Sequence, residues 1–302
     1  MSLTTIILTY NEELHIARCI ENISKLGSRV VIVDSFSSDK TVEIAKQFGA
    51  EVYQNPFISQ AKQFEWAMDN CAVNTDWVFR IDADETIDEE MRENIVKAIN
   101  CVEPGCNGFI LNRKHIFLGK WIKHGGRYPL PMLRIFRRGF GHVEQRWMDE
   151  HIVLNSGYSK ELSGGFEDNN LNAVSWFIDK HNKYATREMI DIQLTKLGIR
   201  TDDAVSESTG ASIKFKRFLK SGVYNKLPYF VRPTCYFLFR YFIQLGFLDG
   251  ARGFAYHFMQ GFWYRCLVDL KCLEFEYLCR QATNKEERIS ILENLTGYRL
   301  ND

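Results

Sequence analysis

Apolar runs and helically spaced segments alternate through the first hundred residues. The continuous apolar runs at 4–9 and 29–34 are typical of strands that are buried on both faces of a sheet. Between them, apolar residues of 12–26 recur with helical spacing as far as Gly27, which favours a helix end. This alternation predicts an α/β fold with a mostly parallel central sheet flanked by helices. The expected strands are 4–9, 29–34, 51–53 and 76–81, and the expected helices are 12–26, 39–48, 59–71 and 87–100.

The pattern changes after residue 105. A loop with glycines and prolines is expected at 119–131, and a long helix over 171–196. The polar segment 202–212 is interpreted as a linker, and an aromatic-rich helical region follows it. We therefore predict one domain over 1–205 and a helical C-terminal region over 206–302. Further strands are expected at 108–114, 133–137 and 151–154.

Composition and charge exclude several classes of protein. The 302 residues include 38 Lys and Arg and 38 Asp and Glu, so the formal net charge is zero, which argues against a strongly basic nucleic-acid binder. The eight cysteines form no CxxC pair and no zinc-ligand spacing, as expected of reduced thiols in a cytosolic protein. The first residues lack the basic and long apolar regions of a signal peptide. A cytoplasmic location is predicted.

Polar and acidic side chains follow three of the expected strands. In an open parallel sheet, ligands bind beyond the carboxyl ends of the strands, so these side chains are expected to line one site. The candidates are Thr9, Tyr10, Asn11 and Glu12 after the first strand, Asp34 at the end of the second, and Asp82 and Asp84 after the fourth.

The Asp82-x-Asp84 pair is the most specific of these features. Two carboxylates just past a strand can face one small cavity, and such oxygen ligands suit Mg²⁺ or Mn²⁺. A divalent ion there would neutralise a departing diphosphate. The alternative is that both acids only cap the following helix and complement its dipole. Asp34 has a similar pair of interpretations, as a ligand for a base or ribose or as a turn residue.

A general base is expected if a hydroxyl group is the nucleophile. The adjacent Asp149 and Glu150 are the best candidates, because a carboxylate near the reacting oxygen can accept its proton. The alternative is a solvated turn between two strands. Other catalytic templates are missing, since the chain has no G-x-G-x-x-G after the first strand, no Walker loop, no H-E-x-x-H and no G-x-S-x-G.

Three stretches resemble the motifs of glycosyltransferase family 2. They are TYNEE from residue 9, VDSFSSDKT from residue 33 and DWVFRIDADE from residue 76, in the order and spacing of that family. WMDEHIVLNSG from residue 147 and GFLDGARGF from residue 246 resemble a bacterial branch that builds lipopolysaccharide cores, capsules and related surface glycans. The resemblance implies a GT-A nucleotide-diphospho-sugar transferase fold and an inverting transfer from a nucleotide-sugar donor, with a UDP-sugar favoured, to a glycan or lipid-linked acceptor.

The resemblance also implies roles for individual residues around the nucleotide and the metal ion. Thr9, Glu12 and Asp34 match positions that hold the nucleotide, with Asp34 facing the uracil or its equivalent. Asp82 and Asp84 match the D-x-D motif of the family, with Asp84 as the direct ligand of Mg²⁺ or Mn²⁺ and Asp82 nearer the ribose or the sugar.

The remaining roles concern the donor sugar and the base. Lys62 and Gln63 lie where relatives carry a basic or amide pair near the donor. Asp149 or Glu150 matches the region of the catalytic base, but the acids stand here in the order Asp-Glu, whereas many relatives have Glu-Asp, so both stay candidates.

Two other functions compete with this interpretation. A sugar-nucleotidyltransferase would use the same strand ends and metal, but it usually carries a glycine-rich, basic phosphate loop after the first strand, and TYNEELHIARC contains no glycine. A non-catalytic scaffold in a membrane glycan assembly would not need the acids that this chain keeps.

The C-terminal region is both basic and aromatic. The segment 213–248 contains no acidic residue, and such helices can lie on an anionic bilayer surface, which would place the protein at the cytoplasmic face of the inner membrane. Charges and a proline interrupt the segment, so it is not expected to span the membrane. The alternative is packing against the first domain or another copy of the chain in a homo-oligomer. The basic residues are Lys214, Lys216, Arg217, Lys220, Lys226, Arg232 and Arg240.

Overall fold

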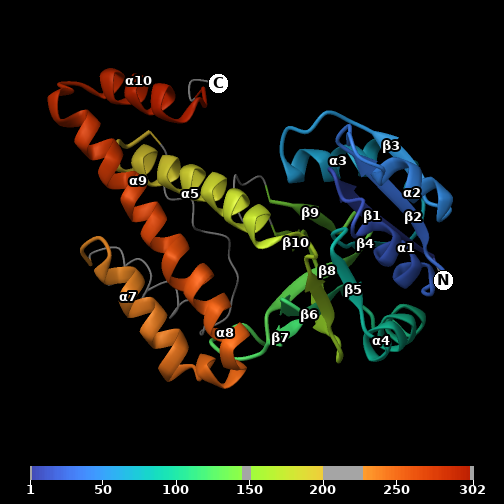
Figure 1. Ribbon diagram of the computed structural model, residues 1–302. Helices are drawn as coiled ribbons and strands as arrows, with labels where there is room; N and C mark the ends of the chain where they lie inside the picture. Colours follow the sequence, from blue (N-terminus) through green and yellow to red (C-terminus); the bar gives the residue numbers. More distant parts are fainter. Residues whose placement is uncertain (1, 145–150, 200–226, 300–302) are drawn as a thin grey trace. The chain divides into compact units, whose positions relative to one another are not determined.

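The computed structural model describes residues 2–144, 151–199 and 227–299. The chain divides into two compact units, Met1–Leu171 and Asn172–Asp302 (Figure 1). The predicted boundary between residues 205 and 206, like the predicted linker, lies outside the described residues.

A parallel four-stranded block forms the first half of the N-terminal unit. Its strands follow the order β3-β2-β1-β4, so the chain first adds strands on one side of β1 and then crosses to the other. Such a switch point leaves a crevice at the carboxyl ends of the two strands where the order reverses. The elements are β1 (Leu3–Thr9), α1 (Ile16–Ser24), β2 (Arg29–Asp34), α2 (Thr41–Gln47), β3 (Glu51–Gln54), α3 (Gln60–Asn70) and β4 (Trp77–Arg80).

Strand β1 is buried on both faces, as its continuous apolar run predicts. Leu3 and Ile7 pack in one core with the apolar stripe of α1, such as Ile20. Ile6 points the other way, into a second core that includes Phe64 of α3. Helices therefore cover both faces of this part of the sheet (Figure 1). The predicted elements of this half are confirmed to within a few residues at their ends.

The second half of the unit makes the sheet mixed. Beyond β4 the order continues β8-β6-β12-β5, and β8 runs antiparallel to both β4 and β6. β11 and β7 also pair with β6, and β9 and β10 form a separate antiparallel pair. The elements are β5 (Glu85–Ile87), α4 (Glu89–Asn100), β6 (Cys106–Phe117), β7 (Lys120–Ile122), β8 (Pro131–Arg137), β9 (Gly141–Val143), β10 (Ile152–Leu154), β11 (Tyr158–Glu161) and β12 (Phe166–Asn169).

The prediction that a helix begins at residue 87 is wrong. Ile87 belongs to β5, where it pairs with Phe166 of β12, and both side chains are buried. The helix starts later because Asp88 caps it, accepting a hydrogen bond from the Met91 amide at 2.8 Å. The short strands β7, β11 and β12 were not predicted, since three or four residues of mixed polarity carry no clear alternation.

Helices form the C-terminal unit. The long helix α5 (Val174–Lys196) packs on α9 (Tyr264–Leu278) through a core that includes Met189, Cys272 and Phe275. The helix α5 therefore belongs to this unit, although the sequence pattern placed it in the first domain. No helix within the described ranges is long and apolar enough to cross a bilayer. The other elements are α7 (Val231–Leu238), η3 (Phe239–Ile243), η4 (Gly246–Asp249), α8 (Gly250–Tyr256), η5 (His257–Trp263), η6 (Cys279–Gln281) and α10 (Lys285–Thr296).

Gly157 offers a test of the packing that brings β11 beside β6. It has a φ of +80°, and a Cβ there would lie 2.5 Å from the Gly105 carbonyl oxygen and against the side chain of Asn107. Gly139 has a φ of +85°, but a Cβ there meets no described atom within 4 Å. We expect Gly139→Ala to lower the free energy of unfolding by about 1 kcal/mol for backbone strain. Gly157→Ala should cost about 1–3 kcal/mol more through overpacking. Urea unfolding measures both, and equal midpoints would contradict the observed contact.

Candidate active site

Thr9 and Asp34 join the carboxyl ends of β1 and β2. They are register partners, and the Thr9 hydroxyl donates a hydrogen bond to Asp34 Oδ1 at 2.9 Å. The Asp34 carboxylate also accepts bonds from the Ser37 amide at 2.8 Å and from the Ser37 hydroxyl at 2.5 Å, and it is fully buried. Asp34 therefore holds the turn after β2 beneath the edge of the sheet. Its contact with a nucleotide stays a prediction.

The loop after β1 presents Tyr10, Asn11 and Glu12 at the same edge. The Tyr10 side chain is 60% exposed. Asn11 has a φ of +56°, and its side-chain oxygen accepts a hydrogen bond from the Ser38 amide at 2.9 Å. This contact ties the loop after β1 to the turn after β2, so the two strand ends form one surface.

His15 links this loop to the chain that leaves β12. Its ring is buried, and Nε2 accepts a hydrogen bond from the Leu171 amide at 2.9 Å. In the neutral ring, Nδ1 therefore carries the proton and donates to Glu12 Oε2, 2.7 Å away. The sequence interpretation missed His15, because a lone histidine near the start of a helical pattern carries no signal of its own.

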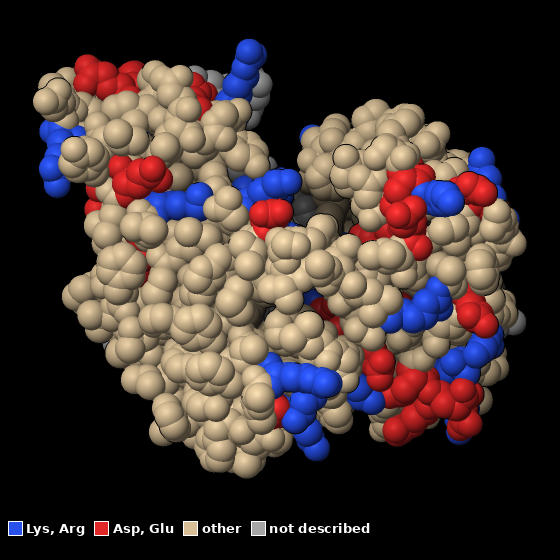
Figure 2. Space-filling model, in the orientation of Figure 1, with Lys and Arg blue, Asp and Glu red and all other residues tan. Residues whose placement is uncertain are grey.

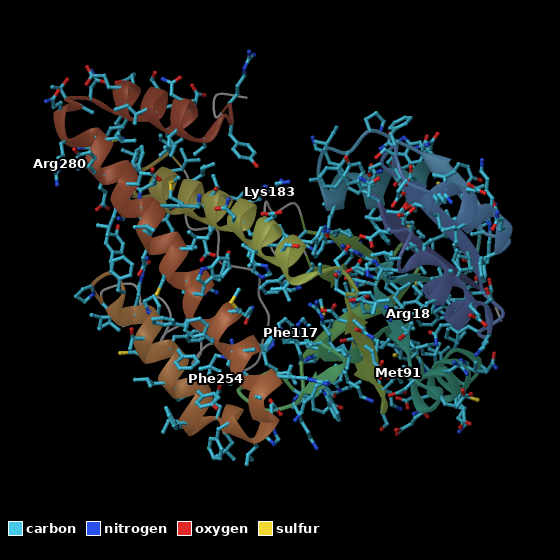
Figure 3. All side chains as sticks on the ribbon, viewed as in Figure 1. Arg18, Met91, Phe117, Lys183, Phe254 and Arg280 are labelled. Carbon is cyan, nitrogen blue, oxygen red and sulfur yellow. The ribbon has the colours of Figure 1, made fainter. Side chains whose placement is uncertain are left out.

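Asp84 is held by the same returning chain. Its Oδ2 accepts a hydrogen bond from the Asn170 amide group at 3.0 Å, and its carbonyl oxygen accepts one from the Asn169 amide at 3.0 Å. Arg18 of α1 donates to the carbonyl oxygens of Asp84 and Asn169, and it lies among the dense side chains of the N-terminal unit (Figure 3). The Asp84 carboxylate therefore has a defined position.

Asp82 lies between two arginines. Its side chain is 39% exposed, with Arg134 at 3.5 Å and Arg80 at 3.9 Å. Burial raises the pKa of Asp82, but Arg134 and Arg80 outweigh it and hold the pKa below its usual range. Arg134 also donates to the buried Glu85 at 2.6 Å, and Glu85 accepts the Asp82 amide at 2.9 Å. Arg134 and Glu85 therefore hold the turn that carries Asp82 and Asp84.

Asp168 of β12 adds a buried negative charge that the sequence pattern did not reveal. It bonds to Arg113 and, at 2.9 Å, to Nδ1 of His115. Burial raises its pKa, but Arg113 and then His115 reverse the effect and hold the pKa well below its usual range. At Asp84 the balance is opposite, since burial, followed by the charge of Asp168, raises its pKa to about 6. The Asp84 carboxylate itself accepts a hydrogen bond from the neutral amide group of Asn170.

Lys62 and Gln63 of α3 play different parts in the structure. Lys62 has an exposed side chain, whereas Gln63 is 1% exposed. The Gln63 amide donates to the Ser35 hydroxyl at 3.1 Å and to the Asn55 carbonyl at 3.0 Å. Gln63 therefore supports the turn after β2 from within, and the placement of both residues near a donor stays a prediction.

The two candidate bases, Asp149 and Glu150, lie outside the described residues. The strands β9 and β10 flank them and pair antiparallel, with Val143 opposite Ile152. The role of either acid as a base stays a prediction.

The sequence model described as "Glycosyl transferase family 2" matches residues 4–163, which include all but the first residue of β1, the Asp82-x-Asp84 turn and β11. The chain belongs to glycosyl transferase family 2. Together with the β3-β2-β1-β4 order, this membership confirms the α/β class and the GT-A fold that the motifs implied.

Similar sequences include bacterial glycosyltransferases. An uncharacterized glycosyltransferase of Rickettsia typhi is 40% identical over 93 residues, which is 31% of each chain, so the match spans about a third of that relative. The lipopolysaccharide core biosynthesis glycosyltransferase LpsC of Rhizobium meliloti is 26% identical over 192 residues, covering 62% of this chain and 70% of LpsC.

Solved structures give weaker matches. Glucosyl-3-phosphoglycerate synthase from Mycobacterium tuberculosis aligns with a TM-score of 0.32 and 20% identity, covering 38% of this chain and 44% of that one. Mannosyl-3-phosphoglycerate synthase from Rubrobacter xylanophilus aligns with a TM-score of 0.33 and 19% identity, covering 39% of this chain and 41% of that one.

The carboxylates at the candidate site of this family 2 chain are suitable ligands for Mg²⁺ or Mn²⁺. Across the part of the chain that the structure describes, no group of three or more His, Cys, Asp or Glu side chains could hold a metal ion. Mg²⁺ does not need such a cage, because it is usually bound by one or two carboxylates together with substrate phosphates and water. Asp82 and Asp84 would supply the carboxylates, and the nearby charge of Asp168, which raises the pKa of Asp84, would also attract a cation.

We expect Asp84→Asn to remove the metal dependence without unfolding the protein. The amide keeps the shape of the side chain but lacks the charge that would bind the cation, so turnover should fall by about 100-fold or more. The rise in unfolding temperature caused by Mn²⁺ with a nucleoside diphosphate should disappear as well. The matched control is Asp76→Asn, because Asp76 is exposed at the opposite end of β4. Equal turnover in the two variants would contradict the assignment.

Proposed function

We propose that the protein is a metal-dependent, inverting glycosyltransferase that moves a sugar, such as a hexose, from a nucleotide-diphospho-sugar to a hydroxyl of a bacterial surface glycan. The observation that carries the proposal is the Asp82–Asp84 turn at the switch point, where the Asn170 amide group holds the Asp84 carboxylate. A UDP-sugar is the favoured donor. The similarity to LpsC of Rhizobium meliloti supports a lipopolysaccharide core acceptor, with capsule glycans as the related class.

The residues of the site would divide the work of binding the donor. Glu12 and the exposed Tyr10 and Lys62 would meet the nucleotide-sugar at the surface. Thr9, Asp34 and Gln63 are buried and would act by holding the strand ends in place. Bound Mg²⁺ or Mn²⁺ would neutralise the charge that develops on the departing diphosphate.

The transfer itself would be a single displacement. A carboxylate of Asp149 or Glu150 accepts the proton of the acceptor hydroxyl while its oxygen forms a bond to the anomeric carbon. The bond between that carbon and the diphosphate oxygen breaks, and the nucleoside diphosphate leaves with the electron pair. Attack opposite the leaving group inverts the anomeric configuration. No covalent enzyme intermediate is required, and positioning supplies much of the rate.

The assignment of the base is tested by Asp149→Asn and Glu150→Gln. One of the two substitutions should lower transfer by about 100-fold or more, because an amide cannot accept the proton. The affinity for the nucleotide-sugar, measured by calorimetry, should stay unchanged in that variant. The other substitution serves as the matched control. If both variants transfer sugar at the rate of the unchanged protein, the base lies elsewhere.

We further propose that the C-terminal unit contacts an anionic membrane surface. The region around α7 and α8 exposes a group of large apolar side chains, each 43–71% exposed, and few charged side chains appear over these helices in Figure 2. An apolar surface of this kind suits the boundary between lipid headgroups and acyl chains. The exposed apolar group comprises Leu238, Phe239, Phe242, Ile243, Leu245, Phe247, Leu248 and Phe254.

Two of the seven Lys and Arg side chains in 213–248 stabilise the fold and are not available to a membrane surface. Arg232 bonds to the buried Asp269, with Nε 2.8 Å from Oδ1. Arg240 is 3% exposed and donates to Gln260 at 2.9 Å. The attraction to anionic lipid would therefore rest on the other five cations, which lie at 214–226, outside the described residues.

Vesicle sedimentation tests this contact. The protein should sediment with phosphatidylglycerol vesicles more than with phosphatidylcholine vesicles, and less at high salt. The double substitution Phe242→Ser and Ile243→Ser should weaken binding by about tenfold, since it removes two exposed apolar side chains from the surface. Leu270→Ser on α9, where Leu270 is 54% exposed, is the control. A protein that stays in the supernatant, or a double variant that changes only the oligomeric mass, would contradict the proposal.

A further inference from the structure

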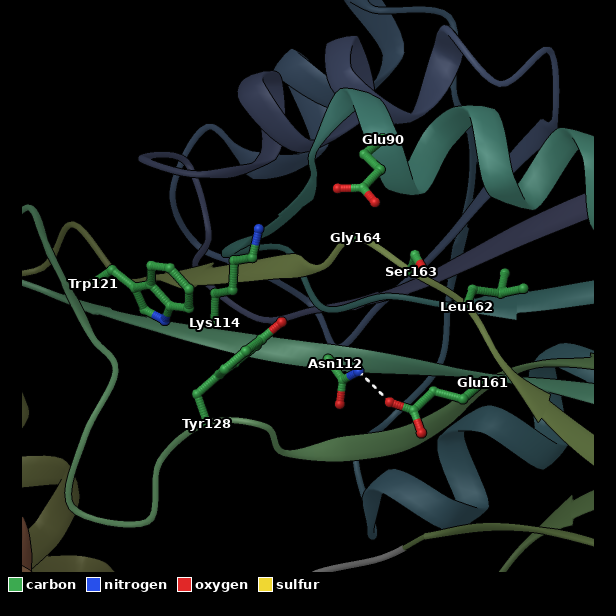
Figure 4. Close-up of a pocket in the computed structure, with 9 residues that line it drawn as sticks. All are labelled: Glu90, Asn112, Lys114, Trp121, Tyr128, Glu161, Leu162, Ser163 and Gly164. Carbon is green, nitrogen blue, oxygen red and sulfur yellow. Dashed lines mark hydrogen bonds between the residues drawn. The ribbon is translucent and has the colours of Figure 1, made fainter. Parts of the chain in front are cut away.

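A cavity of about 510 Å³ lies in the N-terminal unit beside β6, β7 and the start of α4 (Figure 4). Its size falls within the range of small-molecule sites, which is about 300–1,000 Å³. Polar side chains and two aromatic rings line it, and none of them belongs to the candidate active site.

Strand alternation separates this cavity from the active site. Asn112 and Lys114 of β6 point into the cavity, whereas Arg113 and His115 point to the other face and contact Asp168. The register of the neighbouring strands β7 and β11 gives the same assignment of faces. Trp121 of β7 pairs with Ile116, and Glu161 of β11 pairs with Ile110, so both lie on the face of the even-numbered residues. The cavity and the acids around Asp84 therefore use opposite faces of β6.

Two buried polar atoms at the cavity have no hydrogen-bond partner among the residues that the structure describes. One is the side-chain oxygen of Asn112, which is only 7% exposed. The Asn112 amide nitrogen is already engaged, since it donates to Glu161 Oε1 at 2.5 Å (Figure 4). The other atom is the indole nitrogen of Trp121. Unpaired buried polar groups are costly, so a ligand that donates to Asn112 and accepts from Trp121 would relieve both.

The chemistry of the cavity selects a ligand with hydroxyl groups. A hydroxyl can donate to Asn112 and another can accept from Trp121, whereas a phosphate or carboxylate has no proton to donate. Negative ligands would also meet Glu90 and Glu161. The ammonium group of Lys114 does not offset these acids, because it is paired with Asp88 at 2.5 Å.

The aromatic rings complete the match to a sugar. Trp121 and Tyr128 stand edge to face, with centroids 4.9 Å apart and an interplanar angle of 87°. The two rings, at right angles to one another, place apolar carbon atoms next to the hydrogen-bonding groups (Figure 4). A pyranose ring likewise combines apolar and hydrogen-bonding groups, with C–H groups on its faces and hydroxyls around its edge.

We propose that this cavity is a second carbohydrate site, which binds an uncharged pyranose unit of a glycan. It lies across β6 from Asp168, so the sugar held here would not be the one that receives the transferred residue. The identity of this glycan as the acceptor rests on the proposed function. The binding of a sugar to the cavity does not depend on that function. The site would anchor the acceptor chain and add affinity without taking part in the chemistry.

Nuclear magnetic resonance of the indole N–H groups tests the site in the full chain without a donor. The Trp121 signal is assigned from Trp121→Phe, and the probes are the methyl glycosides of glucose, galactose, mannose and N-acetylglucosamine. We expect at least one probe to shift this signal saturably at millimolar concentration. Asn112→Leu, which keeps the size but removes the acceptor, should weaken binding by about tenfold. Tyr128→Leu should weaken it as well, which provides a second variant if Asn112→Leu does not fold.

The controls separate this site from the active site. Trp176→Phe should leave binding unchanged, because Trp176 belongs to the C-terminal unit. Asp84→Asn should also leave it unchanged while transfer is lost. Sugar binding with no transfer in the unchanged protein would overturn only the proposed function. The absence of any saturable shift, equal affinity in both cavity variants, or a shift by uridine but by no pyranoside would overturn the carbohydrate site.

Discussion

The return of β12 to the Asp84 turn is the contact on which the candidate active site depends. Asn169 and Asn170 hold the main chain and the carboxylate of Asp84, and the next residue, Leu171, bonds to His15 beneath the loop after β1. Without this return, Asp84 would lose the groups that hold its carboxylate and its main chain. A site that binds a charged donor needs its groups fixed in advance, because reorganisation at the moment of reaction costs rate.

The same return determines the charge of the site. Burying several carboxylates together is unfavourable unless each is paired, and the N-terminal unit supplies arginines to Asp82 and Asp168. Asp84 receives an amide instead of a cation. The imbalance is therefore local, and a bound divalent cation would offset it. This division, in which some acids are neutralised by the fold and one is left for the ligand, is typical of functional sites with perturbed pKa values.

Strand β6 organises the rest of the N-terminal unit, because its two faces do different work. Arg113 and His115 support the acids of the active site, whereas Asn112 and Lys114 line the proposed carbohydrate cavity. A rigid central strand can support two sites in this way without either disturbing the other. The C-terminal unit has its own core, between α5 and α9.

Local pattern in the sequence was enough to predict the parallel half of the sheet and the strand ends that carry Thr9, Asp34, Asp82 and Asp84. Apolar runs and helical spacing are properties of neighbouring residues, so they can be read without knowing the fold. In the mixed half of the sheet the strands β6, β8 and β10 were predicted, but β5 and β12 were not, because β5 pairs only with β12 among the described strands and β12 lies between β5 and β6. The contacts from Asn170 to Asp84 and from Leu171 to His15 join residues 86 and 156 positions apart. Such pairs leave no local signal, so only the tertiary structure decided which side chains support the acids and which face of β6 each residue serves.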